Sequence, residues 1–134
     1  MNIAVRYCSK TKFGNTRRIA EAIAEGIGVN AVSIDDEPKL VEKADILFLG
    51  GAPYANIMAP ELRSYAEGID PGMVSKVVLF TTSNWSKRTV LALKKILKKK
   101  GIEVCEDYFF SHMLKVDDNL NAAKEFGKKM SMSN

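Results

Sequence analysis

Short apolar runs alternate along the chain with longer segments whose apolar residues recur every three or four positions. Two of the runs, 46–49 and 77–80, are apolar throughout, which is typical of strands buried on both faces of a parallel sheet. The segments 18–27 and 90–97 have the spacing of helices with one buried face. This alternation predicts an α/β fold in which helices cover both faces of a parallel sheet.

The number of segments narrows the architecture further. Five strands and 134 residues favour a three-layer, doubly wound sheet with the order 2-1-3-4-5 over the longer six-stranded dinucleotide fold. The length also fits one domain, residues 1–134. The expected strands are 3–8, 29–34, 46–49, 77–80 and 102–110, and the expected helices are 18–27, 60–69, 90–97 and 120–130.

Some boundaries follow from glycine and polar residues. Gly26 and Gly28 are expected to stop the first helix, and Gly101 to close the third. Residues 40–43 form a short helix at most, and 132–134 are expected to be a frayed tail.

The segment 9–16, between the first strand and the first helix, has the chemistry of an anion site. It contains the hydroxyls of Ser9, Thr11 and Thr16, the carboxamide of Asn15, and Gly14, with no carboxylate. The N–H groups and dipole of a starting helix add positive potential there. The segment matches neither a dinucleotide nor a nucleoside-triphosphate loop, and suits a terminal monophosphate. The alternative is an ordinary helix cap made by Asn15 or Thr16.

Two further polar loops should lie beside this segment. In the order 2-1-3-4-5, the loops after the first, third and fourth strands meet at one edge of the sheet, here called the rim. The loop 51–58 contains Tyr54 and the loop 81–86 contains Trp85, and two aromatic side chains on adjacent loops can hold a flat ring between them. The alternative for each is an amphipathic side chain half-packed on the surface.

Charge and cysteine content limit the possible functions. The net charge is +4, and much of the excess lies in Lys94, Lys95 and 98–100. These lysines form either a solvated helix face or a surface for an acidic partner, and the absence of interleaved aromatic residues argues against nucleic-acid binding. Cys8 and Cys105 are expected to be buried, reduced and too far apart for a disulfide. The single histidine excludes multi-histidine sites, so no metal is expected.

The location expected from the sequence is cytoplasmic. No apolar run has the length needed to span a bilayer, and the chain starts with a strand and not with a signal segment.

The chain resembles the short-chain flavodoxins over nearly its whole length. Residues 11–16 resemble the phosphate loop T/S-x-x-G-N-T of that family, and weaker similarities lie at 50–54, 81–85 and 121–126. The family binds FMN non-covalently and passes electrons one at a time, so the resemblance implies a flavodoxin-like FMN protein for electron transport. The protein itself would supply no catalytic acid, base or nucleophile, because the flavin does the chemistry.

By this resemblance, the phosphate would lie on 9–16 and the isoalloxazine ring between 53–58 and 83–85. The implied FMN-binding residues are Ser9, Thr11, Lys12, Phe13, Gly14, Asn15, Thr16, Ala52, Pro53, Tyr54, Ala55, Asn56, Ile57, Ser83, Asn84 and Trp85.

The charge of the rim departs from the family, whose members are acidic around the flavin. Here the expected rim has no carboxylate, and its cations are Lys10, Lys12, Arg17, Arg18, Lys87 and Arg88. Because reduced flavin is anionic, we expect the reduction potential of the semiquinone-to-hydroquinone step to be higher than in an acidic flavodoxin. The expected partners are redox proteins with an acidic docking face, and the expected state is a monomer or weak dimer.

Two alternatives to an electron carrier remain open. One is a flavin-dependent reductase of a quinone or a porphyrinogen-like acceptor, which would need a substrate pocket beside the ring. The other is a flavodoxin-fold domain that has lost FMN.

Overall fold

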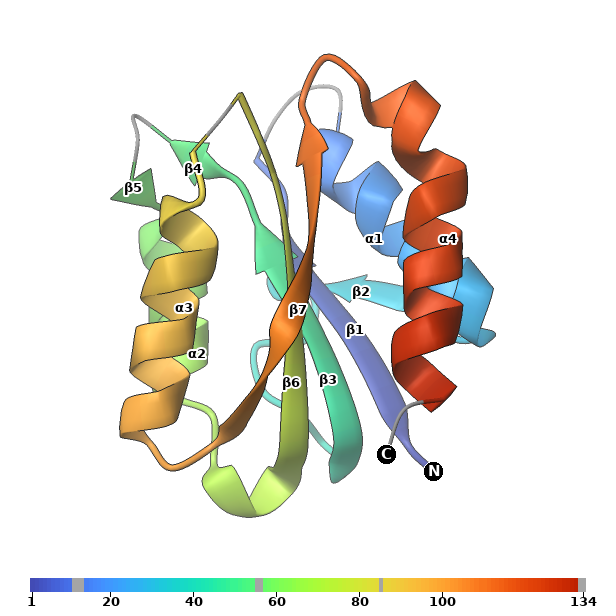
Figure 1. Cartoon of the computed structure of the whole chain (residues 1–134). Coiled ribbons are helices and arrows are strands. Elements are labelled where there is room, and N and C mark those ends of the chain that lie inside the picture. The colour runs from blue at the N-terminus through green and yellow to red at the C-terminus, as the bar shows by residue number, and fades with distance from the viewer. Residues whose placement is uncertain (11–13, 55–56, 85, 133–134) are drawn as a thin grey trace.

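A parallel sheet with the strand order β2-β1-β3-β6-β7 forms the middle layer of the protein (Figure 1). A computed structural model describes residues 1–10, 14–54, 57–84 and 86–132. All four pairings between neighbouring strands of this sheet are parallel in this part of the chain. The strands are β1 (Ile3–Cys8), β2 (Ala31–Ser33), β3 (Ala44–Gly51), β6 (Val74–Ser83) and β7 (Glu103–His112).

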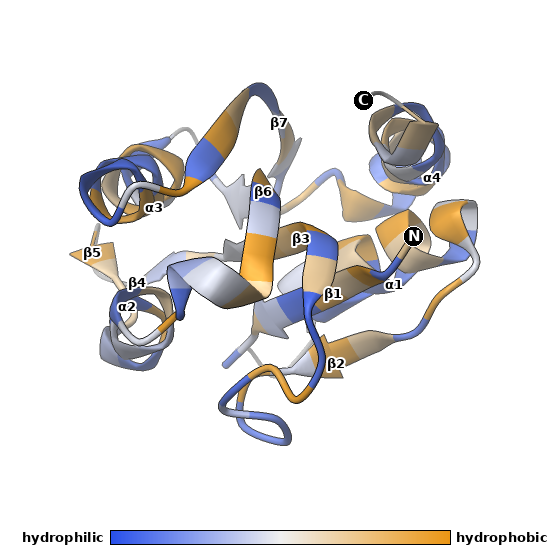
Figure 2. Cartoon of the chain, turned by 90° about the horizontal axis from the view of Figure 1, so that it is seen from below, coloured by the Kyte–Doolittle hydropathy of each residue, from blue (hydrophilic) through white to orange (hydrophobic). Residues whose placement is uncertain are grey.

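Helices cover both faces of the sheet. Viewed along the strands, α1 and α4 lie on one side of it, and α2 and α3 lie on the other (Figure 2). This arrangement confirms the doubly wound α/β fold and the predicted strand order, with β1 between β2 and β3. The helices are α1 (Asn15–Ile27), α2 (Pro60–Glu67), α3 (Arg88–Lys99) and α4 (Val116–Met132), with a short 3-10 helix at Pro71–Met73.

Apolar side chains fill the space on both sides of the sheet. Leu47 and Leu49 of β3 pack in the cluster under α2 and α3. Phe48, between them in sequence, packs with Ile19 and Ile23 of α1 on the other side. Because successive strand residues point to opposite faces, a strand buried on both faces needs a continuous apolar run, as the sequence predicted.

Two glycines let α1 and α4 approach closely. A Cβ atom on Gly26 would lie 2.0 Å from the carbonyl oxygen of Lys124, and one on Gly127 would lie 2.4 Å from that of Ile23. Gly26 therefore lies within α1 and packs against α4, and the prediction that it stops the helix is wrong. The helix ends at Ile27, and Gly28 follows in the left-handed region with φ 95°.

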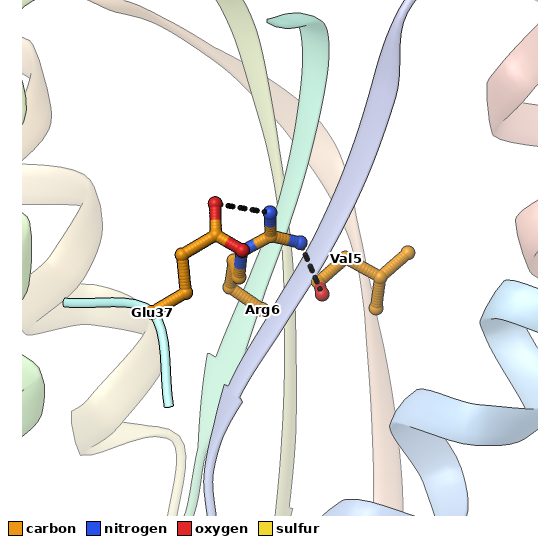
Figure 3. A network of polar contacts seen from close by, with 3 residues as sticks. All are labelled: Val5, Arg6 and Glu37. Atoms are coloured by element: carbon orange, nitrogen blue, oxygen red, sulfur yellow. Dashed lines mark hydrogen bonds and ion pairs between the residues drawn. The ribbon is translucent and has the colours of Figure 1, made fainter. Parts of the chain in front are cut away.

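The connection from β2 to β3 has no helix over residues 34–43, all of which the structure describes. Residues 40–43, for which the sequence allowed a short helix at most, thus form none. On the sheet face below this connection lies Arg6 of β1, which is only 8% exposed. Its Nη2 donates to Glu37 Oε1 at 3.0 Å, and its Nη1 donates to the Val5 carbonyl at 3.0 Å (Figure 3). The buried charge is thus paired by the connection that covers it.

Several strands differ in length from the prediction. β3 includes Gly50 and Gly51, which were expected to end it, and β6 extends through 81–83, which were expected to be loop. β2 is shorter than predicted, and β7 reaches His112. Backbone pairing extends β3, β6 and β7 beyond their apolar centres.

Two very short strands, β4 (Pro53–Tyr54) and β5 (Ile57–Met58), pair antiparallel after β3. Within the described residues, the helices are too short or too polar to cross a lipid bilayer.

Candidate functional site

The carboxyl ends of three neighbouring strands meet at the rim. Cys8 of β1 is in register with Gly51 of β3, and Gly51 is in register with Thr81 of β6. The loops that follow these strands therefore leave the sheet side by side, as the strand order predicted. α1 begins at this edge, and the chain winds to opposite faces of the sheet on the two sides of β1 and β3. Such a switch point is where open α/β sheets bind ligands.

The first turn of α1 has the properties of an anion site. It follows Gly14, which adopts a left-handed conformation with φ 61°. Among the described residues, no side chain caps this helix end, and its first turn contains no acidic residue. Arg17 and Arg18 add positive charge to the same turn. The predicted alternative of a side-chain cap by Asn15 or Thr16 is therefore wrong, and the first N–H groups of the helix point toward the rim.

Ser9 places a second donor at this edge. Its Oγ is buried and has no hydrogen-bond partner among the residues that the structure describes. Leaving a buried hydroxyl without a partner costs about 1–3 kcal/mol. A ligand oxygen that accepts from this hydroxyl would remove that cost.

The hydroxyl of Thr16 has a partner inside the protein. Thr16 is 1% exposed, and its Oγ1 lies 2.7 Å from Oγ1 of Thr82 at the end of β6. The amide Nδ2 of Asn15 donates to the Met113 carbonyl at 3.3 Å. Of the predicted side-chain polar groups of this segment that the structure describes, Ser9 Oγ is thus the one without a partner in the protein.

The other predicted loops also lie at the rim. Ala52, directly before β4, is buried, and Ile57 of β5, which is in register with Tyr54 of β4, is exposed. Ser83 Oγ donates to the Ser86 carbonyl at 2.6 Å and so holds its own loop, while Asn84 is exposed. The remaining predicted residues lie outside the described part of the chain: Thr11, Lys12, Phe13, Ala55, Asn56 and Trp85, together with the side chain of Tyr54.

The rim contains carboxylates, contrary to the prediction. Glu61, in the first turn of α2, forms an ion pair with Lys10, and Asp117, in the first turn of α4, forms one with Arg18. The hydrogen bond between Lys10 and Glu61 raises the pKa of the lysine and lowers the pKa of the carboxyl. The sequence predicts that Glu61 lies at the start of the helix 60–69. It does not show that the strand order brings this first helical turn beside Lys10.

A cavity that the sequence did not indicate opens beside Glu61. Its volume is about 420 Å³, and it lies between the end of β2 and the start of α2. Tyr65 contributes to its wall with a buried hydroxyl that has no partner among the described residues, and burial raises the pKa of this phenol. The lining residues are Ile34, Asp35, Pro38, Pro60, Glu61, Ser64 and Tyr65.

Cys8 does not have the properties of a nucleophile. Burial raises the pKa of its thiol to about 11, and the carboxylates of Asp35 and Glu61 act in the same direction. The thiol is therefore protonated at neutral pH. Cys8 and Cys105 are free, on strands β1 and β7.

A comparison with curated proteins gives one distant relative. The chain is 26% identical over 138 residues to an uncharacterized protein of Methanocaldococcus jannaschii, and the match covers 92% of this chain and 35% of that protein. The chain therefore spans about a third of the curated relative that it matches. No protein-family model matches the chain.

Solved structures show the fold. A flavodoxin from the domain Archaea is similar with a TM-score of 0.75 and 20% identity, over 98% of this chain and 96% of that one. Flavodoxin 2 from Bacillus cereus gives a TM-score of 0.74 and 19% identity, over 98% of both chains. The flavodiiron core of Flv1 from Synechocystis sp. PCC6803 is similar with a TM-score of 0.74 and 20% identity, over 98% of this chain and 35% of that one. The chain thus has the flavodoxin-like fold.

Proposed function

We propose that this flavodoxin-like chain binds FMN at the rim and acts as a one-electron carrier. One observation supports this most strongly: the start of α1, which no described side chain caps and which contains no acidic residue, lies at the switch point of the sheet. Ser9 brings to the same edge a buried hydroxyl that has no partner among the described residues. A phosphate group satisfies both kinds of donor at once. The fold that the chain shares with flavodoxins supports the same cofactor.

The phosphate would accept hydrogen bonds from the first N–H groups of α1 and from Ser9 Oγ. In this proposal residues 11–13 complete the loop around it, while Asn15 and Thr16 hold the start of α1 through Met113 and Thr82. Residues 52–57 and 83–85 would lie on the two sides of the flavin ring. Gly14 is required there for its left-handed conformation, which other residues adopt at a cost.

The flavin, when bound, supplies the electron-transfer chemistry, and the chain binds it, orients it and sets its electrostatic surroundings. The ion pairs of Lys10 with Glu61 and of Arg18 with Asp117 offset part of the positive charge near the rim. We therefore infer a smaller rise in reduction potential than the uncompensated cations would cause.

The partners of this carrier would be redox proteins that dock with an acidic face against its basic surface. The net charge of +4 favours such encounters through long-range attraction. We propose that the 134 residues act as one domain, as a monomer or weak dimer.

The cavity beside Glu61 favours a second candidate, a flavin-dependent reductase. A reductase needs a substrate pocket close to the flavin, and this cavity of about 420 Å³ lies next to the residue that pairs with Lys10. Steady consumption of NAD(P)H in the presence of a quinone would favour the reductase over the carrier.

The proposal is tested by mixing the purified protein with FMN. We expect a shift of the flavin absorption bands at micromolar concentrations, and a yellow protein after removal of free flavin. A protein that leaves the FMN spectrum unchanged and comes off the desalting column colourless would contradict both flavin-dependent candidates.

A further inference from the structure

The lysines of α3 divide into two groups with different surroundings. On the side toward β7, Lys94 Nζ donates to Glu106 Oε2 at 2.7 Å, and Lys98 Nζ lies 3.6 Å from Glu106 Oε1. On the side toward α2, Lys95 and Lys99 take part in none of the ion pairs found among the described residues. Among the described residues, the lysines of the basic run therefore share a carboxylate on one side of the helix only.

Lys95 and Lys99 line a groove between α2 and α3 with a volume of about 500 Å³. One turn separates the two lysines, and one turn separates Arg63 from Glu67 on the facing side of α2. Lys100 closes the end of the groove, where its Nζ donates to the Glu67 carbonyl at 2.7 Å. The groove thus brings together four cationic side chains and one carboxylate.

The groove also has an apolar part. Ala92 and Ile96 of α3 line it, and both are half-buried against the core of this face. An occupant that matches the groove carries carboxylates along its edges and apolar side chains toward Ala92 and Ile96.

We propose that this groove binds an acidic segment with interspersed apolar residues, supplied by a partner protein. Anionic groups of the segment would relieve the repulsion among Arg63, Lys95 and Lys99, which have no ion-pair partner among the described residues. A nucleic acid is the less suitable polyanion, because none of the described residues that line the groove is an aromatic residue on which bases stack.

The groove runs toward the edge of the sheet opposite the rim. α2 and α3 both start at the rim, and Glu67 and Lys99 are their last residues (Figure 1). A partner held at this groove leaves the rim uncovered, so binding and electron transfer would use different surfaces. This inference rests on the proposed function only in taking the partner to be a redox protein.

The test uses a fluorescein-labelled peptide of alternating Glu and Leu residues and the flavin-free protein. Fluorescence anisotropy at low salt should show binding that weakens in high salt. We expect K95E/K99E to weaken binding by at least about tenfold, because two attractive charges become repulsive. K128E/K129E is the matched control, since it changes the net charge equally on exposed positions of α4, on the other face of the sheet. It should stay within about twofold of the wild type.

Further measurements show whether a variant has lost a contact with the peptide or has failed to fold. They also distinguish a site for the peptide from a site that binds any polyanion. The neutral variant K95Q/K99Q should bind with intermediate affinity, and thermal unfolding should show that all variants fold. An equal loss in K128E/K129E would overturn the inference, and so would tighter binding of a single-stranded oligonucleotide that K95E/K99E abolishes. FMN binding is measured separately. If the protein binds the peptide but not FMN, the groove is supported and the proposed carrier function is contradicted. If it binds FMN but not the peptide, only the inference about the groove is contradicted.

Discussion

Thr16 Oγ1 and Thr82 Oγ1 lie 2.7 Å apart and join the first turn of α1 to the end of β6. Both side chains are buried, with 1% and 2% exposure. The pair fixes the start of α1 against the sheet at the rim, where the phosphate site is proposed. The hydroxyl of Thr16 therefore helps to hold the start of the helix in place.

The threonine pair can be tested by a double-mutant cycle. Thr82→Val keeps the shape of the side chain but leaves the Thr16 hydroxyl buried without its partner, so the free energy of unfolding should fall by about 1–2 kcal/mol. Thr16→Val should have a similar effect. The double variant should recover about 1 kcal/mol of the summed loss, measured by urea unfolding. Strictly additive effects would show that the two hydroxyls do not interact.

Ser9→Ala should separate stability from ligand binding. Removing a buried hydroxyl that has no described partner should leave the free energy of unfolding of the flavin-free protein unchanged or raise it. The same substitution should weaken FMN binding about tenfold, the effect of losing one charge-assisted hydrogen bond. Isothermal calorimetry with FMN measures this. Ser131→Ala, on α4 away from the rim, is the control and should leave both quantities as they are; an unchanged FMN affinity in Ser9→Ala would remove Ser9 from the site.

Removing one partner of the ion pair between Arg6 and Glu37 should lower the free energy of unfolding strongly, whereas replacing both partners by apolar residues should change it little. Its side chains are 10% and 26% exposed, so Glu37→Ala leaves a guanidinium nearly buried without its counter-charge (Figure 3). We expect the free energy of unfolding to fall by about 3 kcal/mol. The double variant Arg6→Met with Glu37→Leu should lie within about 1 kcal/mol of the wild type, because an apolar pair of similar volume fits the same space. Urea unfolding decides: a double variant as unstable as Glu37→Ala would contradict this account.

The raised pKa of Cys8 should appear in the pH dependence of stability. The folded protein holds the thiol proton up to about pH 11, whereas the unfolded chain releases it near pH 9. The contribution of Cys8 to the free energy of unfolding is therefore complete below about pH 9. It decreases as the pH rises toward 11.

Urea unfolding across this pH range, under reducing conditions, should show a shallower loss of stability in Cys8→Ala than in the wild type. Tyr7 and Tyr65, whose pKa values burial also raises, titrate in both proteins and cancel in the difference. Parallel curves for the two proteins would place the thiol in a water-accessible environment.

The strand order and the three loops at the rim followed from the sequence because their signals are local. The apolar runs of β3 and β6 need no knowledge of their neighbours, and a doubly wound sheet then brings the loops after β1, β3 and β6 to one edge. Strand ends were less predictable, since residues such as Thr81 to Ser83 extend β6 through backbone pairing with β7 and not through hydrophobicity.

The features that the sequence did not predict all depend on contacts between distant elements. Gly26 resembles a helix stop until α4 is seen to pack with the Lys124 carbonyl against it. Arg6 and Glu37, which are 31 positions apart, come together because the connection between β2 and β3 forms no helix over 34–43. Glu61 reaches Lys10 only when α2 starts beside the first loop. Local patterns contain no information about such pairings.

In the proposed function, the start of α1 binds the single phosphate group of FMN. The most direct test compares FMN with riboflavin, which has the same ring and no phosphate, by isothermal calorimetry on the flavin-free protein. We predict that FMN binds at least about tenfold more tightly than riboflavin, corresponding to 1.4 kcal/mol or more from the phosphate contacts. Equal affinities for the two flavins, or no binding of FMN at micromolar concentrations, would contradict the account.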